Sequence, residues 1–252
     1  MRKYTCIVLS LLVILALLSV TFTPALASDA HQSQTYAVNA NGETYGNNLQ
    51  AIALGYEADL IAAVGQFGIE GYVRKSELYD DGVTCPDDAK NAPSVYYIPL
   101  YKSDGTTVIG RFKVGGVESE TQDRSNSYAY GNYSGIYYSD FTGQARSGIG
   151  SASGRVVGIT AIEDLTTARP DGYFCVNVEI YDQETGKLVS SSGFHYYSSA
   201  SGQLTQYYSY THSYRVSDTS KAFYCNGAVR VWRGTYYDTH GTFVSLAQNP
   251  GQ

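Results

Sequence analysis

Alternation of apolar and polar residues runs through the second half of the chain, and this period-two pattern most limits the fold. We expect strands at 155–161, 173–181, 187–197, 203–216, 221–225, 228–232 and 236–246. Between several of them lie Gly- or Asn-containing turns, at 183–186, 199–202 and 226–227. Many short strands joined by such turns predict an antiparallel β-sandwich or an open barrel.

The segment 173–181 shows the alternation most clearly. Because successive strand residues point to opposite faces, four apolar side chains share one face, which we expect to be core. They are Phe174, Val176, Val178 and Ile180. Cys175, Asn177 and Glu179 then point the other way.

The first half predicts a small β-rich module with little helix. Residues 58–65 and 69–74 form one expected hairpin, and 96–101 and 106–112 form a second. The second turn ends in Asp104-Gly105, a strong hairpin signal because Gly supplies positive φ. Residues 43–54 and 86–91 are the helix candidates. The predicted fold class is therefore mainly β, a small α+β module followed by the sandwich or barrel.

The N-terminus is typical of a secretory signal peptide. Arg2 and Lys3 precede an apolar run, and Ala25 and Ala27 occupy the small-residue positions of a cleavage site. We therefore predict a signal peptide over 1–27. The alternative is an uncleaved membrane anchor, since residues 6–22 approach the length that crosses a bilayer.

Composition divides the mature chain into two segments. Residues 28–114 read as ordinary globular sequence, and 115–127 as a polar linker. The remaining residues, 128–252, contain 16 of the 25 tyrosines, which follow no fixed repeat. We expect this range to form the Tyr-rich sandwich-like domain.

Charge and cysteine content bound the partners and the cellular compartment. The formal charge of −6 becomes about −8 without Arg2 and Lys3, which disfavours nucleic acid and anionic membranes. We expect membrane contact only through an uncleaved signal segment. In an oxidising compartment a disulfide is expected, and we pair Cys175 with Cys225, which leaves Cys85 as a loop thiol.

Part of the first half resembles a known module. The runs Thr44-Tyr45-Gly46, 58–65, 71–78, 98–101 and 103–110 resemble a small, uncharacterised module recurrent in exported proteins of Gram-positive bacteria. The resemblance covers about residues 44–112 and implies a cell envelope, without catalytic residues. The run 71–78 is also similar to the closing strand and turn of bacterial SH3-like domains, which often attach exported proteins to the cell wall.

An aromatic row is the main candidate for ligand binding. On a strand over 203–216, Tyr208, Tyr210, His212 and Tyr214 share one face. Such a row can stack on sugar rings or extended peptides, or it can hold a sheet together by cross-strand packing. Trp232, the only tryptophan, is a further binding candidate for which we expect partial burial.

No catalytic, metal or cofactor motif emerges from the sequence. Asp238 and His240 share a strand face, but His195, His212 and His240 have no metal-ligand spacing. The Gly-rich run 148–154 lacks the lysine of a phosphate loop and reads as flexible loop. We expect no cofactor, no metal and no catalytic residue.

Three functions fit these observations. The first is a secreted or cell-surface, non-catalytic binding or adhesion protein of a bacterial envelope, with cell-wall glycan or a surface protein as partner. The second is a hydrolase of cell-wall polymer that gathers scattered carboxylates and a histidine. The third is a small secreted effector or bacteriocin-like protein.

Overall fold

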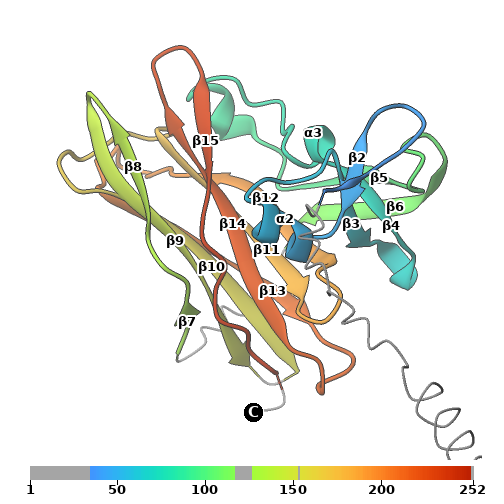
Figure 1. The fold of residues 1–252 in the computed structure, drawn as a ribbon. Helices are drawn as coiled ribbons and strands as arrows, with labels where there is room; N and C mark the ends of the chain where they lie inside the picture. Colours follow the sequence, from blue (N-terminus) through green and yellow to red (C-terminus); the bar gives the residue numbers. More distant parts are fainter. Residues whose placement is uncertain (1–34, 117–126, 153, 251–252) are drawn as a thin grey trace, which may run out of the picture. The chain divides into compact units, whose positions relative to one another are not determined.

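Two β-sheets make up most of the structure, a computed structural model that describes residues 35–116, 127–152 and 154–250 (Figure 1). The first sheet has the strand order β1-β2-β3-β4-β5-β6-β12-β11-β14-β15. The second has the order β13-β10-β9-β7, and β8 also pairs with β9. The protein is therefore mainly β, and the predicted fold class is confirmed.

The first half of the chain supplies the first six strands of the large sheet. They are β1 (Ala37–Val38), β2 (Thr44–Gly46), β3 (Leu60–Val64), β4 (Glu70–Arg74), β5 (Val95–Tyr101) and β6 (Val108–Gly115). Short helical elements separate them: α2 (Asn48–Leu54), η1 (Gln66–Gly68), α3 (Lys75–Leu78) and η2 (Asp88–Asn91). Both expected hairpins are present, as β3–β4 and β5–β6.

Among the described residues, the second half supplies nine strands. They are β7 (Ala129–Tyr130), β8 (Ser134–Tyr138), β9 (Phe141–Ala152), β10 (Arg155–Asp164), β11 (Phe174–Asp182), β12 (Leu188–Tyr196), β13 (Tyr207–Arg215), β14 (Phe223–Trp232) and β15 (Tyr237–Gly241). Antiparallel pairs β9–β10 and β10–β13 build the second sheet, and β12–β11–β14–β15 complete the first.

The two sheets pack face to face around the predicted apolar face of β11. Phe174 and Val176 join Phe141 and Ile162 of the second sheet in one buried cluster. Farther along the strand, Val178 and Ile180 join Ile149 and Val156 in another. Burial of these side chains removes apolar surface from water and is the main force that holds the layers together.

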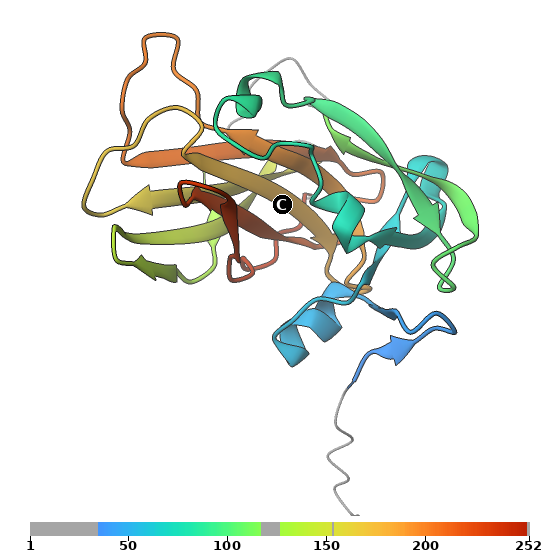
Figure 2. The same cartoon turned by 90° about the horizontal axis from the view of Figure 1, so that it is seen from above.

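The opposite face of β11 is also buried, because the first half of the chain covers it (Figure 2). Cys175 packs with Phe194 and Tyr196, and Tyr79 and Val83 lie against this cluster. The Arg230 guanidinium of β14 forms an ion pair with Asp81 at 3.0 Å. Because both faces of β11 are covered, its apolar side chains on one face and its polar side chains on the other are all buried.

Both halves of the chain therefore contribute to one compact unit from Thr35 onward. β6 pairs with β12 at Val114 and Ser191, and β3 pairs with β12 at Ala63 and Leu188. The predicted boundary near residue 114 falls at the end of β6, and the linker 115–127 lies mostly outside the described residues. The division of the mature chain into two domains joined by this linker stays a prediction.

Two local predictions were wrong, and the bounds of a third were too wide. Asn226-Gly227 is not a turn but lies inside β14, where Gly227 pairs with Val178. Residues 148–152 of the expected flexible loop belong to β9, and Gly148 lies under the Tyr130 ring. The helix expected over 43–54 begins only at Asn48, because Asn47 caps it and residues 44–46 form β2.

The expected Cys175–Cys225 disulfide is absent, and Cys85, Cys175 and Cys225 are free thiols. Cys175 pairs with Arg230 across the β11–β14 ladder, whereas Cys225 pairs with Ile180. The two cysteines are thus offset by five residues, about 17 Å at strand rise. A disulfide requires Cα atoms closer than about 7 Å. The thiols also belong to clusters on opposite faces of the sheet.

The predicted signal peptide over 1–27 lies outside the described residues. Within the residues that the structure does describe, no helix has the length and apolar character needed to cross a membrane.

Candidate functional site

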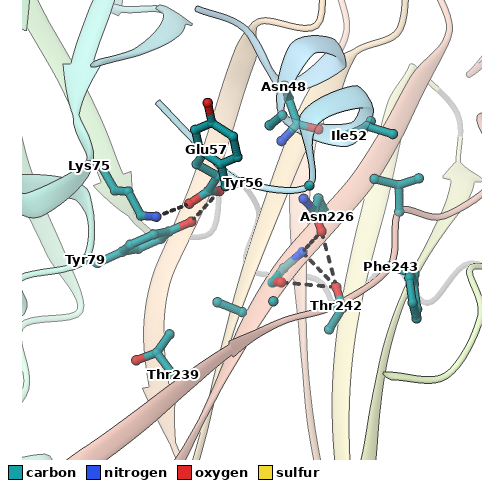
Figure 3. Close-up of a pocket in the computed structure, with 16 residues that line it drawn as sticks. Asn48, Ile52, Tyr56, Glu57, Lys75, Tyr79, Asn226, Thr239, Thr242 and Phe243 are labelled. Atoms are coloured by element: carbon teal, nitrogen blue, oxygen red, sulfur yellow. Dashed lines mark hydrogen bonds and ion pairs between the residues drawn. The ribbon is translucent and has the colours of Figure 1, made fainter. Parts of the chain in front are cut away.

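A pocket of about 700 Å³ opens beside α2, α3 and the β14–β15 pair, and it is the candidate site (Figure 3). Its lining comes from both halves of the chain. The polar lining residues are Asn48, Glu57, Lys75, Tyr79, Asn226, Thr239 and Thr242. Exposed apolar or aromatic side chains on its rim are Ile52, Tyr56 and Phe243.

Helix α2 forms one wall of the pocket, and its N-terminal and C-terminal caps determine where it begins and ends. The Asn47 side chain accepts a hydrogen bond from the Gln50 amide at 3.0 Å, and Gln50 Oε1 accepts from the Asn47 amide at 3.0 Å. This capping box satisfies two backbone donors at the helix start. Gly55 ends the helix with φ of 80°, a conformation that favours glycine, and the chain then turns to present Tyr56 and Glu57.

The helix is anchored to the second half of the chain. Asn48 is buried, and its side-chain oxygen accepts a hydrogen bond from the Tyr224 hydroxyl at 3.1 Å. The Asn48 amide donates to the Gly186 carbonyl at 2.9 Å. The wall is thus held by partners that lie more than a hundred residues away in sequence.

Glu57, Lys75 and Tyr79 converge on the opposite side of the pocket. Lys75 Nζ lies 3.0 Å from Glu57 Oε2, and the Tyr79 hydroxyl donates to Glu57 Oε1 at 3.1 Å. α3 follows β4 directly, and the Lys75 amide donates to the Asp59 carbonyl at 2.8 Å. This turn directs Lys75 and Tyr79 toward the same carboxylate, as Figure 3 shows.

A second carboxyl group, that of Glu179, lies buried behind Tyr79. Glu179 is 1% exposed and accepts hydrogen bonds from Tyr181 at 2.7 Å and Asn177 at 2.9 Å. Burial, and next the negative charge of Glu57, raise its pKa to about 8. Glu179 is therefore mostly protonated at pH 7, which spares this buried site a second negative charge.

The floor of the pocket is a hydroxyl and amide network between β14 and the segment after β15. Thr242 Oγ1 donates to the Gly227 carbonyl at 3.1 Å and lies 2.7 Å from Ser147 Oγ. The Gly227 amide also reaches Asn226 Oδ1 at 3.0 Å. The close approach needs Gly227, because an added Cβ would lie 2.2 Å from Thr160 Oγ1.

The sequence-predicted aromatic row does not contribute to this pocket. Tyr208 and Tyr210 pack against the cluster around Phe174, and Tyr214 packs against the cluster around Val178. His212 is buried at 3% exposure. This burial favours the packing interpretation of the row, and its role in ligand binding stays a prediction.

The remaining candidates also lie elsewhere. Trp232 is partly buried and packs on Tyr237 with ring centroids 5.0 Å apart. Asp238 and His240 lie on one face of β15, where both side chains contact the Tyr138 hydroxyl. Within the described ranges no group of three or more His, Cys, Asp or Glu side chains could hold a metal ion.

Sequence reasoning missed the residues that line the pocket. Tyr56 and Glu57 lie in a connection, Lys75 begins a one-turn helix that Tyr79 follows, and Thr242 follows an edge strand. The one available signal was the run 71–78, which contains Lys75. No protein-family model, curated protein or solved structure matches the chain.

Proposed function

We propose that this protein is a secreted or cell-surface, non-catalytic binding protein of a bacterial envelope, and that its pocket beside α2 holds a carbohydrate. The supporting observation is the pairing of exposed rings with a polar floor. Tyr56 is 55% exposed and Phe243 is 56% exposed, and in Figure 3 they flank Asn226 from opposite sides.

The chemistry of a sugar matches these two kinds of surface. The C–H face of a pyranose stacks on aromatic rings, while its hydroxyls exchange hydrogen bonds with amide, hydroxyl and charged groups. Lys75, Glu57 and Thr239 supply such groups at the edge of the pocket. A pocket with apolar walls and a few placed polar groups is typical of small-ligand sites.

A hydrolase of cell-wall polymer is the alternative, favoured by the two carboxyl groups Glu57 and Glu179 around Tyr79. An ionised and a protonated carboxyl together form the usual pair for glycoside hydrolysis. A general acid, however, must reach the leaving oxygen within hydrogen-bond distance. Glu179 is 1% exposed and does not line the pocket, so the arrangement supports binding over hydrolysis.

Binding of the mature protein to isolated cell wall and to a glycan array tests the proposal. Tyr56→Ala and Phe243→Ala should each weaken retention about tenfold, since a stacking ring contributes roughly 1–3 kcal/mol. Tyr137→Ala is the matched control, because this Tyr is 75% exposed on β8 and lies outside the pocket.

Two outcomes would contradict the proposal. The first is wild-type retention of both the Tyr56→Ala and the Phe243→Ala variant, whatever the result for Tyr137→Ala. The second is release of reducing ends from the polymer that Glu57→Gln abolishes, which would favour the hydrolase.

A further inference from the structure

A second pocket, of about 430 Å³, lies where η1, the end of β6, β12 and β13 meet. Its polar lining side chains are those of Gln66, Lys113, Ser190, His212, Tyr214 and Ser217. No Asp or Glu belongs to the lining among the described residues. In a chain with a net charge of −6, a pocket with a cation and without acids favours an anionic ligand.

Lys113 supplies the positive charge of this pocket. It is partly buried on β6 and forms no ion pair with any residue in the described parts of the chain. An ammonium group that has no carboxylate partner among the described residues can bind the carboxylate of a ligand.

Phe67 lies at the rim of this pocket in an energetically unfavourable backbone conformation. Its φ of 61° makes it the sole non-glycine residue with positive φ in the part of the chain that the structure describes, and its side chain is 97% exposed. A bulky residue in the left-handed region is strained, and exposure of the whole ring gains no burial in return. Such strain at a pocket rim points to a role in recognition.

Ser190 and His212 form the inner wall. Ser190 Oγ lies 2.7 Å from His212 Nε2, and Ser190 is partly exposed while His212 is buried. Burial, followed by the charges of His195 and Lys113, lowers the pKa of His212 to about 3. A histidine that resists protonation is a poor general base, so this pair is unsuited to activate a nucleophile. When His212 Nε2 donates to Ser190, the Ser190 hydroxyl is left to donate into the pocket.

We propose that this second pocket binds a small organic carboxylate with an apolar group, the carboxylate on Lys113 and Ser190 and the apolar group against Phe67. One ammonium matches one monovalent carboxylate, whereas a dianionic phosphate would leave a charge uncompensated. The site is separate from the carbohydrate pocket and does not depend on the proposed function.

Titration of the mature protein with N-acetyl-phenylalanine and with its uncharged amide, followed by NMR or calorimetry, tests the proposal. The acid should bind at least tenfold more tightly than the amide. Lys113→Gln should abolish that preference, and Lys113→Arg should retain it. Lys102→Gln is the matched control, because Lys102 is exposed and lies outside this pocket.

Phe67→Gly provides a second, independent readout. Glycine adopts positive φ without strain, so this variant should melt at a higher temperature while it binds the acid less tightly. Equal affinity for the acid and the amide, or an unchanged preference in Lys113→Gln, would overturn the proposal. Inorganic phosphate binding as tightly as the acid would also overturn it, because the site would then recognise charge alone.

Discussion

The buried carboxyl of Glu179 lies behind Tyr79, whose hydroxyl is 3.5 Å from Glu179 Oε2. This relationship joins the two halves of the chain, because Tyr79 follows α3 and Glu179 lies in the middle of β11. The same hydroxyl contacts Glu57 in the pocket. Protonation of the buried carboxyl is therefore linked to the stability of the wall that carries Glu57 and Lys75.

Stability should fall as pH rises from about 4.5 to 8, in part because of Glu179. Its pKa is about 8 in the folded state against an ordinary 4.5, so in this window the unfolded chain releases a proton that the folded chain retains. At pH 7 this effect should lower the free energy of unfolding by on the order of 3 kcal/mol, and Glu179→Gln should remove the effect. Denaturant melts of both proteins from pH 4 to 9 measure the difference.

The exposed Glu184 on the loop after β11 is the control position. Glu184→Gln should show the same pH profile as the wild type. A Glu179→Gln profile that parallels the wild type across the whole range would mean that Glu179 is ionised in the folded protein.

Thiol labelling should distinguish the free cysteines from the disulfide that the sequence predicted. In denaturant without reductant, Cys85, Cys175 and Cys225 should all react with iodoacetamide. The intact mass of the labelled protein measures how many thiols have reacted. In the native protein Cys85 should react first, because Cys175 and Cys225 are buried and burial raises the pKa of both thiols. Labelling of Cys85 alone in denaturant would establish the Cys175–Cys225 bridge.

Removal of the aromatic row should destabilise the protein. Tyr210 stacks on His195 with ring centroids 3.5 Å apart and packs against both inter-sheet clusters. Tyr210→Ala should cost about 2 kcal/mol, since truncation of a packed ring leaves a cavity. Tyr207→Ala, on the same strand at 49% exposure, should cost well below 1 kcal/mol. Equal melting temperatures for both variants would contradict the packing interpretation.

Period-two alternation located β10 to β15 approximately, because alternating side chains reveal which face of a strand is buried, but it did not predict β7 or β8. It failed in β9, where Gly148 and Gly150 carry no side chain to mark a face. It also gave no sign that the Asn177 and Glu179 face of β11 is buried, since that depends on covering by the first half of the chain.

The pocket residues could not be predicted for the same reason. Glu57 and Lys75 are separated in sequence by both strands of the β3–β4 hairpin, and Thr242 comes from the far end of the chain. Their assembly depends on non-local pairing, which local sequence patterns do not encode. The Cys175–Cys225 prediction failed because both cysteines were only known to lie on strands of the second half, and the five-residue offset between them depends on the β11–β14 register.

Gly227 offers a sharp test of the β14 assignment and of the pocket floor. In the structure its φ is not positive, and an added Cβ would lie 2.2 Å from Thr160 Oγ1 and 2.5 Å from the Asn177 carbonyl oxygen. Gly227→Ala should therefore lower the free energy of unfolding by about 1–3 kcal/mol through overpacking. Gly241 is the matched control, because it lies in the paired strand β15 and an added Cβ meets nothing within 4 Å. Gly241→Ala should change stability by less than about 0.5 kcal/mol. Chemical denaturation of the two variants measures both effects, and a Gly227→Ala variant as stable as Gly241→Ala would show that the two sheets do not approach each other closely at this strand.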